Sequence, residues 1–110
     1  MLFRSGDLMR SFRHIADLIK TKRTTHAERY SQSDLSHLLG YKNGQFISNV
    51  ERGLCSIPLK MLKKVSQILE ISPLELKDAV LKDYRETLEM NFQSSTGIER
   101  PGEIQKEVES

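Results

Sequence analysis

The fold is decided by residues 31–53, which read SQSDLSHLLGYKNGQFISNVERG. In its first half, Ser31 is suited to cap a helix over residues 32–39, because a serine hydroxyl can accept a backbone N–H from the first helical turn. Asp34 stands at the third helical position, where a capping box has its Glu and where negative charge favours a helix start. Gly40 can end the helix in the left-handed conformation. This half therefore predicts one short helix with both ends marked.

The second half of the stretch predicts another short helix. Residues 41–44 are expected to form a turn, in which Asn43 can cap a helix over residues 44–52. Gly53 then ends that helix by the same left-handed device. Two short helices joined by a turn make a helix-turn-helix unit.

The helix expected over residues 44–52 has two chemically different faces. Phe46, Ile47 and Val50 share one side, which suits a buried surface. The opposite side is rich in amides and holds Gln45, Ser48, Asn49 and Arg52. The paired donor and acceptor of a Gln or Asn side chain match the major-groove edge of adenine, and arginine matches guanine or a phosphate. The outer face is therefore predicted to read base edges in DNA.

An amphipathic helix is expected before this unit, over residues 7–22. Either Ser5 or Asp7 can cap it, and the polar residues 24–29 are expected to form a loop after it. Its apolar residues recur at intervals of three and four, and they are Leu8, Met9, Phe12, Ile15, Ala16 and Ile19.

Two more helices are predicted after the unit. Pro58 suits the first turn of a fourth helix, with Ser56 as its cap. The expected buried stripe of this helix is Leu59, Met61, Leu62, Val65, Ile68 and Leu69. Residues 72–75 (SPLE) combine a capping box with proline at the first helical position, and the fifth helix is expected to extend to Met90.

Length and composition fit one domain. A chain of 110 residues can bury a single hydrophobic core, and we find no strand pattern in it. We therefore expect a compact all-α domain of five helices over residues 7–91, with an N-terminal extension at 1–6. Residues 92–110 hold Ser-Ser-Thr-Gly, Pro-Gly and a sparse acidic run, so they are expected to form a flexible tail.

The charge is unevenly distributed along the chain. Residues 1–64 hold 12 Lys and Arg against 5 Asp and Glu, whereas residues 65–110 hold 5 against 10. A basic front half suits a surface that binds a polyanion, and an acidic back half suits a second, separate surface.

Several classes of protein are not expected. Cys55 is the only cysteine, which excludes an intrachain disulfide framework and a cysteine-rich zinc site. The three histidines have no helical spacing that pairs them, and no nucleophile stands beside a base, so we expect no metal, no cofactor and no enzymatic activity. No stretch approaches the roughly 20 apolar residues of a membrane span, and the start lacks the apolar run of a secretory signal. A cytoplasmic protein without membrane contact is therefore expected.

Three runs of the sequence, taken in order, resemble one known family. They are Tyr30–Tyr41 with its Ser-Gln opening and Leu-Gly closing, Phe46–Gly53 with Ile-Ser-x-Val-Glu-Arg-Gly, and Pro58–Leu69 with its Pro-x-x-x-Leu start. This combination resembles the Cro and phage-repressor type of helix-turn-helix, also called the Xre family, over roughly residues 8–76. The resemblance implies a bacterial or phage-type five-helix domain whose third helix enters the major groove of double-stranded DNA.

The resemblance also implies roles for individual residues. Gln32 stands where the family often has a glutamine that holds a phosphate and buttresses the first reading residue, and Glu51 stands where an acidic residue pairs with Arg23 or Lys22 of the first helix. The base-reading positions, with Ser48 added from the outer face, are Asn43, Gly44, Gln45, Ser48 and Asn49.

Two departures from the family pattern bear on the backbone contacts. The turn at 42–45 is one residue longer than usual, and the loop at 54–57 lacks the Lys and Arg that often clamp the DNA backbone. Phosphate contacts are therefore expected from Gln32, Arg29, Lys42, Arg52 and Lys60.

The fifth helix is longer than such a domain needs. An apolar stripe continues along it and comprises Leu81, Tyr84, Leu88 and Phe92. In one interpretation the stripe joins two copies, so that paired reading helices lie about 34 Å apart on a palindromic site. In the other, the stripe folds back on the first helix.

The sequence favours a sequence-specific, dimeric transcriptional regulator that binds DNA. The alternative is an interaction or ligand-sensing module on the same scaffold, without base-specific DNA binding, that meets a protein partner through the fifth helix or the acidic tail.

Overall fold

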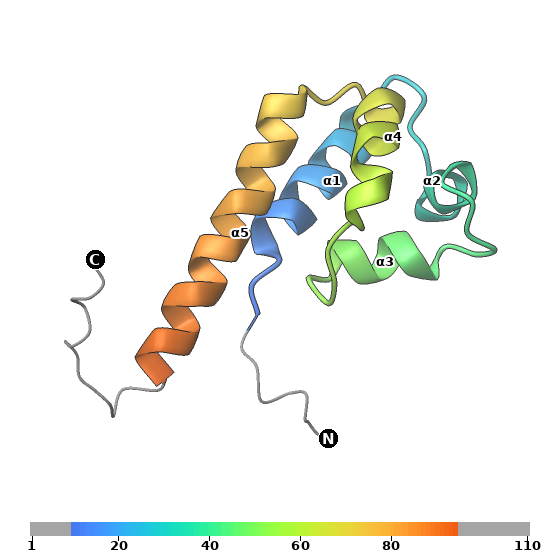
Figure 1. The fold of residues 1–110 in the computed structure, drawn as a ribbon. Helices are drawn as coiled ribbons and strands as arrows, with labels where there is room; N and C mark the ends of the chain where they lie inside the picture. The colour runs from blue at the N-terminus through green and yellow to red at the C-terminus, as the bar shows by residue number, and fades with distance from the viewer. Residues whose placement is uncertain (1–9, 95–110) are drawn as a thin grey trace.

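The computed structural model describes residues 10–94, which form five α-helices and no strand (Figure 1). In chain order they are α1 (Arg13–Thr25), α2 (Gln32–Leu38), α3 (Gln45–Glu51), α4 (Leu59–Leu69) and α5 (Pro73–Ser94). The expected all-α fold with five helices is confirmed. The extension at 1–6 and all of the expected tail from residue 95 onward lie outside the described residues, while residues 92–94 continue α5.

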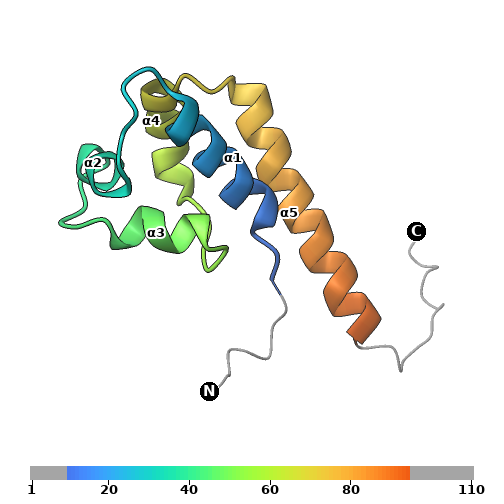
Figure 2. The ribbon, with the colours of Figure 1, turned by 180° about the vertical axis from the view of Figure 1, so that it is seen from behind.

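The helices surround α1. It contacts α5 on one side and α3 on the other, and α2 packs against α3 at the end of the molecule away from α5 (Figures 1 and 2). The longest helix is α5, and its C-terminal half projects beyond the body that the other helices form (Figures 1 and 2).

One apolar core joins all five helices. Burying a Val, Leu or Ile side chain contributes about 1.5 to 3 kcal/mol, so these residues dominate the folding energy. The core side chains that are almost fully buried are Ile15, Ile19, Leu35, Leu39, Ile47, Val50, Val65, Leu69, Ile71 and Leu76. Leu59 was expected among them but is 82% exposed, because it is the first residue of α4 and faces solvent there.

The predicted start of α2 is confirmed, and the helix ends at Leu38, one residue before the predicted end. The Ser31 hydroxyl accepts the N–H of Asp34 at 2.9 Å, and the Asp34 carboxylate accepts the N–H of Ser31 at 3.2 Å, which completes a capping box. Gly40 follows the helix with φ +94°, a left-handed conformation that residues with a Cβ rarely adopt.

The prediction for α1 is wrong at both ends within the described residues. The helix begins at Arg13, because the chain before it leaves the helical path where the N–H of Ser11 donates to the Thr87 hydroxyl at 2.9 Å. It ends at Thr25 rather than at residue 22, and the hydroxyls of Thr24 and Thr25 donate to carbonyls one turn back. Ser5 and Asp7, the expected caps, lie outside the described residues.

Two further helix starts differ from the prediction. Pro58 is the residue before α4, with ψ 144°, and the Ser56 side chain does not cap the helix. In α3 the capping position belongs to Gly44, and the helix runs from Gln45 to Glu51. Asn43 nevertheless accepts the N–H of Gln45 on its side-chain oxygen at 2.8 Å, so it satisfies a free N–H of the first turn from one residue further back.

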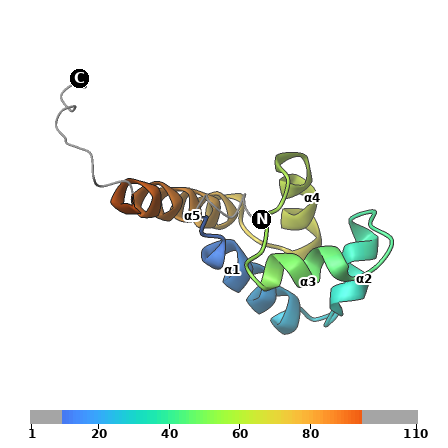
Figure 3. The same cartoon turned by 90° about the horizontal axis from the view of Figure 1, so that it is seen from below.

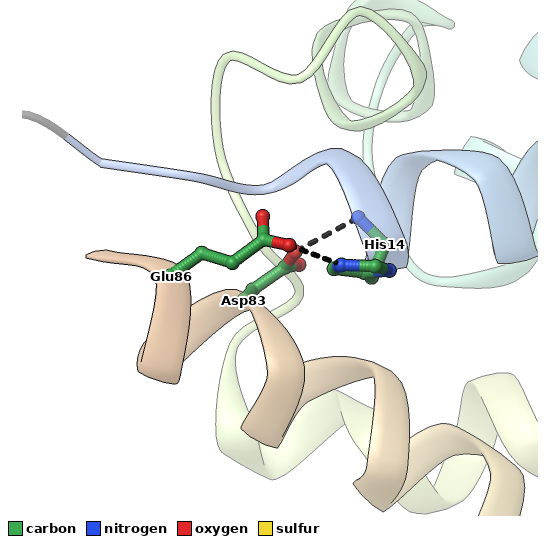
Figure 4. A group of neighbouring side chains, drawn as sticks. All are labelled: His14, Asp83 and Glu86. Carbon is green, nitrogen blue, oxygen red and sulfur yellow. Dashed lines mark hydrogen bonds and ion pairs between the residues drawn. The ribbon is translucent and has the colours of Figure 1, made fainter. Parts of the chain in front are cut away.

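The start of α1 is capped by another helix instead of by its own side chains. Asp83 of α5 is 4% exposed, and its two carboxylate oxygens accept the N–H groups of His14 and Ile15 at 2.8 and 3.0 Å (Figure 4). A carboxylate at a helix N-terminus also interacts favourably with the helix dipole. Asp83 therefore fixes α5 against α1.

Glu86, one turn further along α5, holds the same junction. Its carboxylate accepts hydrogen bonds from the side chains of Ser11, Arg13 and His14, the last from Nε2 at 2.7 Å (Figure 4). The bonds from Arg13, His14 and Ser11, in that order of importance, lower the pKa of Glu86 from 4.5 to about 2.

We predict that Glu86→Gln makes folding less sensitive to acid. Because the pKa of Glu86 is lower in the folded state than in the unfolded chain, its stabilising effect is complete above pH 4.5 and is lost as the pH falls to about 2. Urea unfolding across that range should show a steeper loss of stability in the wild type than in the variant. Glu89→Gln, an exposed carboxylate on the same helix, is the control and should behave as the wild type. Equal slopes for all three proteins would contradict the prediction.

Candidate nucleic-acid interface

Helix α3 lies at an edge of the molecule. Seen from below, no other helix of the described chain covers it, while α2 stands beside its N-terminal end (Figure 3). In Figure 1, α2 is seen nearly end-on and α3 lies across the view, so the two helices cross steeply. This is the arrangement that a helix-turn-helix requires.

The inner face of α3 is fastened to α2 and the core. Ile47 and Val50 are fully buried, and the N–H of Ile47 donates to the buried Ser36 hydroxyl at 3.2 Å. The rings of Tyr41 and Phe46 stack with their centroids 4.1 Å apart. Both rings pack against the core.

Gly44 has a packing role in the turn. A Cβ placed there would lie 3.1 Å from the Cα of Ser33, which is tighter than most contacts of a real Cβ. The turn therefore approaches α2 closely, and a larger residue at position 44 would require the backbone of Ser33 to shift by a few tenths of an ångström. Its backbone remains the only part of Gly44 that could touch DNA.

The outer face of α3 presents amides. Gln45 is exposed, Ser48 and Asn49 are half-buried, and Nε2 of Gln45 donates to Oδ1 of Asn49 at 2.8 Å. With Asn43, whose side chain binds the Gln45 N–H, three predicted reading residues form one hydrogen-bonded group. The spacing of four residues could have indicated the Gln45–Asn49 pair from the sequence.

A buried ion pair supports this face from behind. The Glu51 side chain is 3% exposed, and Arg23 donates to it from Nε at 2.6 Å and from a terminal nitrogen at 2.9 Å. Arg23 also donates to the carbonyl of Tyr30 at 3.0 Å, and Nε2 of Gln32 donates to Glu51 at 2.9 Å. Of the two expected partners of Glu51, Arg23 is therefore the one that pairs with it. Lys22 instead pairs with Glu75, with 3.4 Å between Nζ and Oε1. The amide of Gln32, expected to buttress the first reading residue, is bonded to Glu51.

We predict that Arg23→Met lowers the free energy of unfolding by about 3 to 5 kcal/mol, because it leaves the Glu51 carboxylate buried and unpaired. Chemical denaturation measures this loss, and Lys20→Met, an exposed position on the same helix, is the control. The double variant Arg23→Met/Glu51→Met should recover part of the loss. An effect of Arg23→Met no larger than that of the control would refute the role given to the pair.

The remaining expected phosphate contacts are exposed basic side chains on separate segments. Arg29 lies in the loop before α2, Lys42 in the turn, Arg52 directly after α3, and Lys60 in the first turn of α4. The backbone of Arg29 is left-handed, with φ +51°. The carbonyl oxygen of Lys42 accepts a hydrogen bond from Nε2 of His37 at 2.7 Å. All four side chains are open to solvent, as a contact with DNA phosphates would need.

Other reactive groups of the described chain have local explanations. His14, Asp83 and Glu86 offer atoms within 4.8 Å of one another, which is the kind of cluster that could hold a metal ion (Figure 4). Sequence spacing missed this cluster because its members come from two helices. Each carboxylate already accepts hydrogen bonds at the start of α1, and these contacts account for the arrangement.

The free cysteine has a local explanation too. Burial raises the pKa of the Cys55 thiol, which disfavours the reactive thiolate.

The apolar stripe of α5 faces away from α1. Leu81 and Tyr84 are each 60% exposed, Leu88 is 41% exposed and Phe92 is 74% exposed. The helix meets α1 through the opposite face, with Asp83, Glu86 and Thr87. Over residues 10–94, the stripe therefore does not fold back on α1. None of the helices in residues 10–94 is long and apolar enough to cross a membrane.

Comparison with known proteins identifies no relative. The chain matches no protein-family model, no curated protein and no solved structure. Membership of the Cro and phage-repressor type family remains a prediction from the sequence motifs.

Proposed function

We propose that this protein is a sequence-specific DNA-binding regulator that places α3 in the major groove. The observation that carries the proposal is the contrast between the two faces of α3. Its inner face is locked by Ile47 and Val50, and its outer face presents Gln45 and Asn49 at an uncovered edge. A groove-reading helix needs this combination, because amides discriminate bases only when the helix that carries them is held rigidly.

The charges near α3 support the same proposal. The only carboxylate within the helix, that of Glu51, is buried and paired with Arg23, so it does not face an approaching phosphate. Arg52 is exposed directly after the helix, and Lys42 is exposed in the turn before it. Exposed cations at both ends can neutralise phosphates and make binding dependent on salt.

We predict different effects for a reading residue and a phosphate contact. Gln45→Ala should weaken binding to the preferred duplex by about 1 to 3 kcal/mol and relax the preference at one base pair, because base contacts carry specificity. Lys42→Ala should weaken binding to all duplexes alike and make the salt dependence shallower. Titration of labelled duplexes at several salt concentrations measures both effects.

Lys82→Ala is the charge control, since Lys82 lies on α5 and pairs with Asp78 at 3.1 Å. It should leave DNA affinity unchanged. If Gln45→Ala left both affinity and base preference as in the wild type, α3 would not be the reading helix.

We further propose that two copies pair through the α5 stripe, Leu81, Tyr84, Leu88 and Phe92. These positions recur at intervals of three and four, so they form one exposed apolar face of α5, opposite the face that meets α1. Exposed apolar faces of this kind mark interaction sites. Two-fold pairing would present two reading helices to a palindromic site.

We predict that Leu81→Lys converts a dimer into a monomer, because it places a charge within the paired apolar surface. Light scattering after size exclusion measures the mass, and affinity for a two-half-site duplex should fall at least tenfold. Leu59→Lys makes the same chemical change at an exposed leucine of α4 and should stay dimeric. A wild-type chain that is monomeric at high concentration would overturn this part of the proposal.

A protein-interaction module is the second candidate. It is favoured by Leu54, which is 58% exposed in the loop after α3 where a phosphate clamp would carry a basic side chain. In that case a selection from random duplexes would enrich no motif, and Leu54→Lys would abolish binding to a protein partner.

A further inference from the structure

The outer face of α4 carries three lysines that pair with no carboxylate of residues 10–94. Lys60, Lys63 and Lys64 are all exposed, and their spacing of three and four residues puts them on one side of the helix. By contrast, Lys22 and Lys82 each pair with a carboxylate of α5. Because α4 contains no Asp or Glu, its three lysines repel one another, and an anionic partner would relieve that repulsion.

An apolar side chain belongs to the same surface. Leu59, the first residue of α4, is 82% exposed. It stands four residues before Lys63, one helical turn away, so it adjoins the lysines. We call the surface of Leu59, Lys60, Lys63 and Lys64 the α4 lysine face. A row of phosphates would neutralise the lysines and leave Leu59 in water, whereas an acidic peptide with apolar residues would cover both.

The chain that follows α5 contains a peptide of that chemistry. Residues 103–109 read EIQKEVE, so three glutamates stand against one lysine and are interleaved with Ile104 and Val108. The composition thus complements the α4 lysine face in charge and offers apolar side chains for Leu59. Residues 95–102 connect this segment to α5 and keep it close to the face at all times. Such a connection gives a weak contact a high effective concentration.

The segment is long enough to reach the α4 lysine face. The C-terminal end of α5 points away from α4 (Figures 1 and 2), and the 22 residues of α5 span about 33 Å. Residues 95–109 in extended conformation span up to about 50 Å. Since α4 ends only a few residues before α5 begins, a segment that returns along α5 arrives at α4.

We propose that residues 103–109 dock on the α4 lysine face of their own chain and compete there with DNA phosphates. The docking follows from charge, apolar content and reach. The competition rests on the proposed function, in which Lys60 is one of the phosphate contacts. A duplex carries a much denser negative charge than the segment, so bound DNA displaces it, and the segment lowers DNA affinity without blocking the reading helix.

Carbodiimide coupling of the full chain without DNA tests the docking, because the reagent joins a lysine directly to a carboxylate in contact with it. Mass spectrometry then measures the links from residues 103–109 to each lysine. We expect about fivefold more links to the α4 lysine face than to Lys20 and Lys77, which are exposed on α1 and α5. The yield should not depend on protein concentration, and Leu59→Ser should lower it.

Removal of the charges of the segment tests the competition. In the full-length variant Glu103→Gln/Glu107→Gln/Glu109→Gln, affinity for a duplex at low salt should rise about threefold or more, because the lysines are free for phosphates. Lys106→Gln makes the segment more acidic and should lower the affinity. Glu89→Gln, at an exposed position of α5, is the control and should bind as the wild type.

A general repulsion between glutamates and DNA would give a similar rise without any docking. The same glutamate substitutions are therefore repeated in Lys60→Gln/Lys63→Gln/Lys64→Gln, where docking has no lysines to use. We expect no further change in affinity in that background. A rise as large as in the wild type would overturn the competition.

Docking and DNA binding fail in different ways. Links spread evenly over all exposed lysines, or links whose yield rises with protein concentration, would overturn docking within one chain. If a duplex still bound in that case, DNA would be the partner of the α4 lysine face. Links concentrated on α4 together with no duplex binding by any variant would support the docking and overturn the proposed function.

Discussion

The buried carboxylate of Glu51 is the constraint on which the arrangement of α2 and α3 depends. A charge removed from water is tolerated only when it is paired and fully hydrogen-bonded. Arg23 meets that demand with two bonds from α1, and Gln32 adds a third from the start of α2. Since Arg23 also holds the carbonyl of Tyr30, one ion pair ties together α1, the loop before α2, the first turn of α2 and the last turn of α3. None of these segments can move without leaving a buried charge unpaired.

The outer face of α3 follows from that fixed position. Ile47 and Val50 attach the middle of the helix to the core, and Gly44 lets the turn before the helix approach Ser33 closely. Gln45 and Asn49 are consequently held on a rigid support and point away from the body. A surface arranged before binding loses less entropy when it meets its ligand, which is the physical basis for proposing that these amides recognise a partner.

The junction of α1 and α5 shows how a polar contact shapes the rest of a helix. Asp83 caps the open end of α1 from α5, so this end of α1 needs no cap from its own sequence. Glu86 binds the side chains of Ser11, Arg13 and His14 beside it. Because these carboxylates and Thr87 occupy the face toward α1, the stripe of Leu81, Tyr84, Leu88 and Phe92 lies on the opposite face. The same helix thereby combines an intramolecular polar surface with an exposed apolar one.

Local chemistry alone determined the elements whose causes lie within a few residues. Ser31 with Asp34, Gly40 and the apolar spacing of Ile47 and Val50 predict α2, its end and the buried face of α3, because caps, left-handed glycines and helical periodicity act over one turn of chain. Tertiary structure decided the start of α1, the partner of Gln32, and the face of α5 that stays exposed. Each of these depends on a group far away in the sequence, such as Asp83 against His14 or Glu51 against Gln32, and only packing brings such groups within hydrogen-bonding distance.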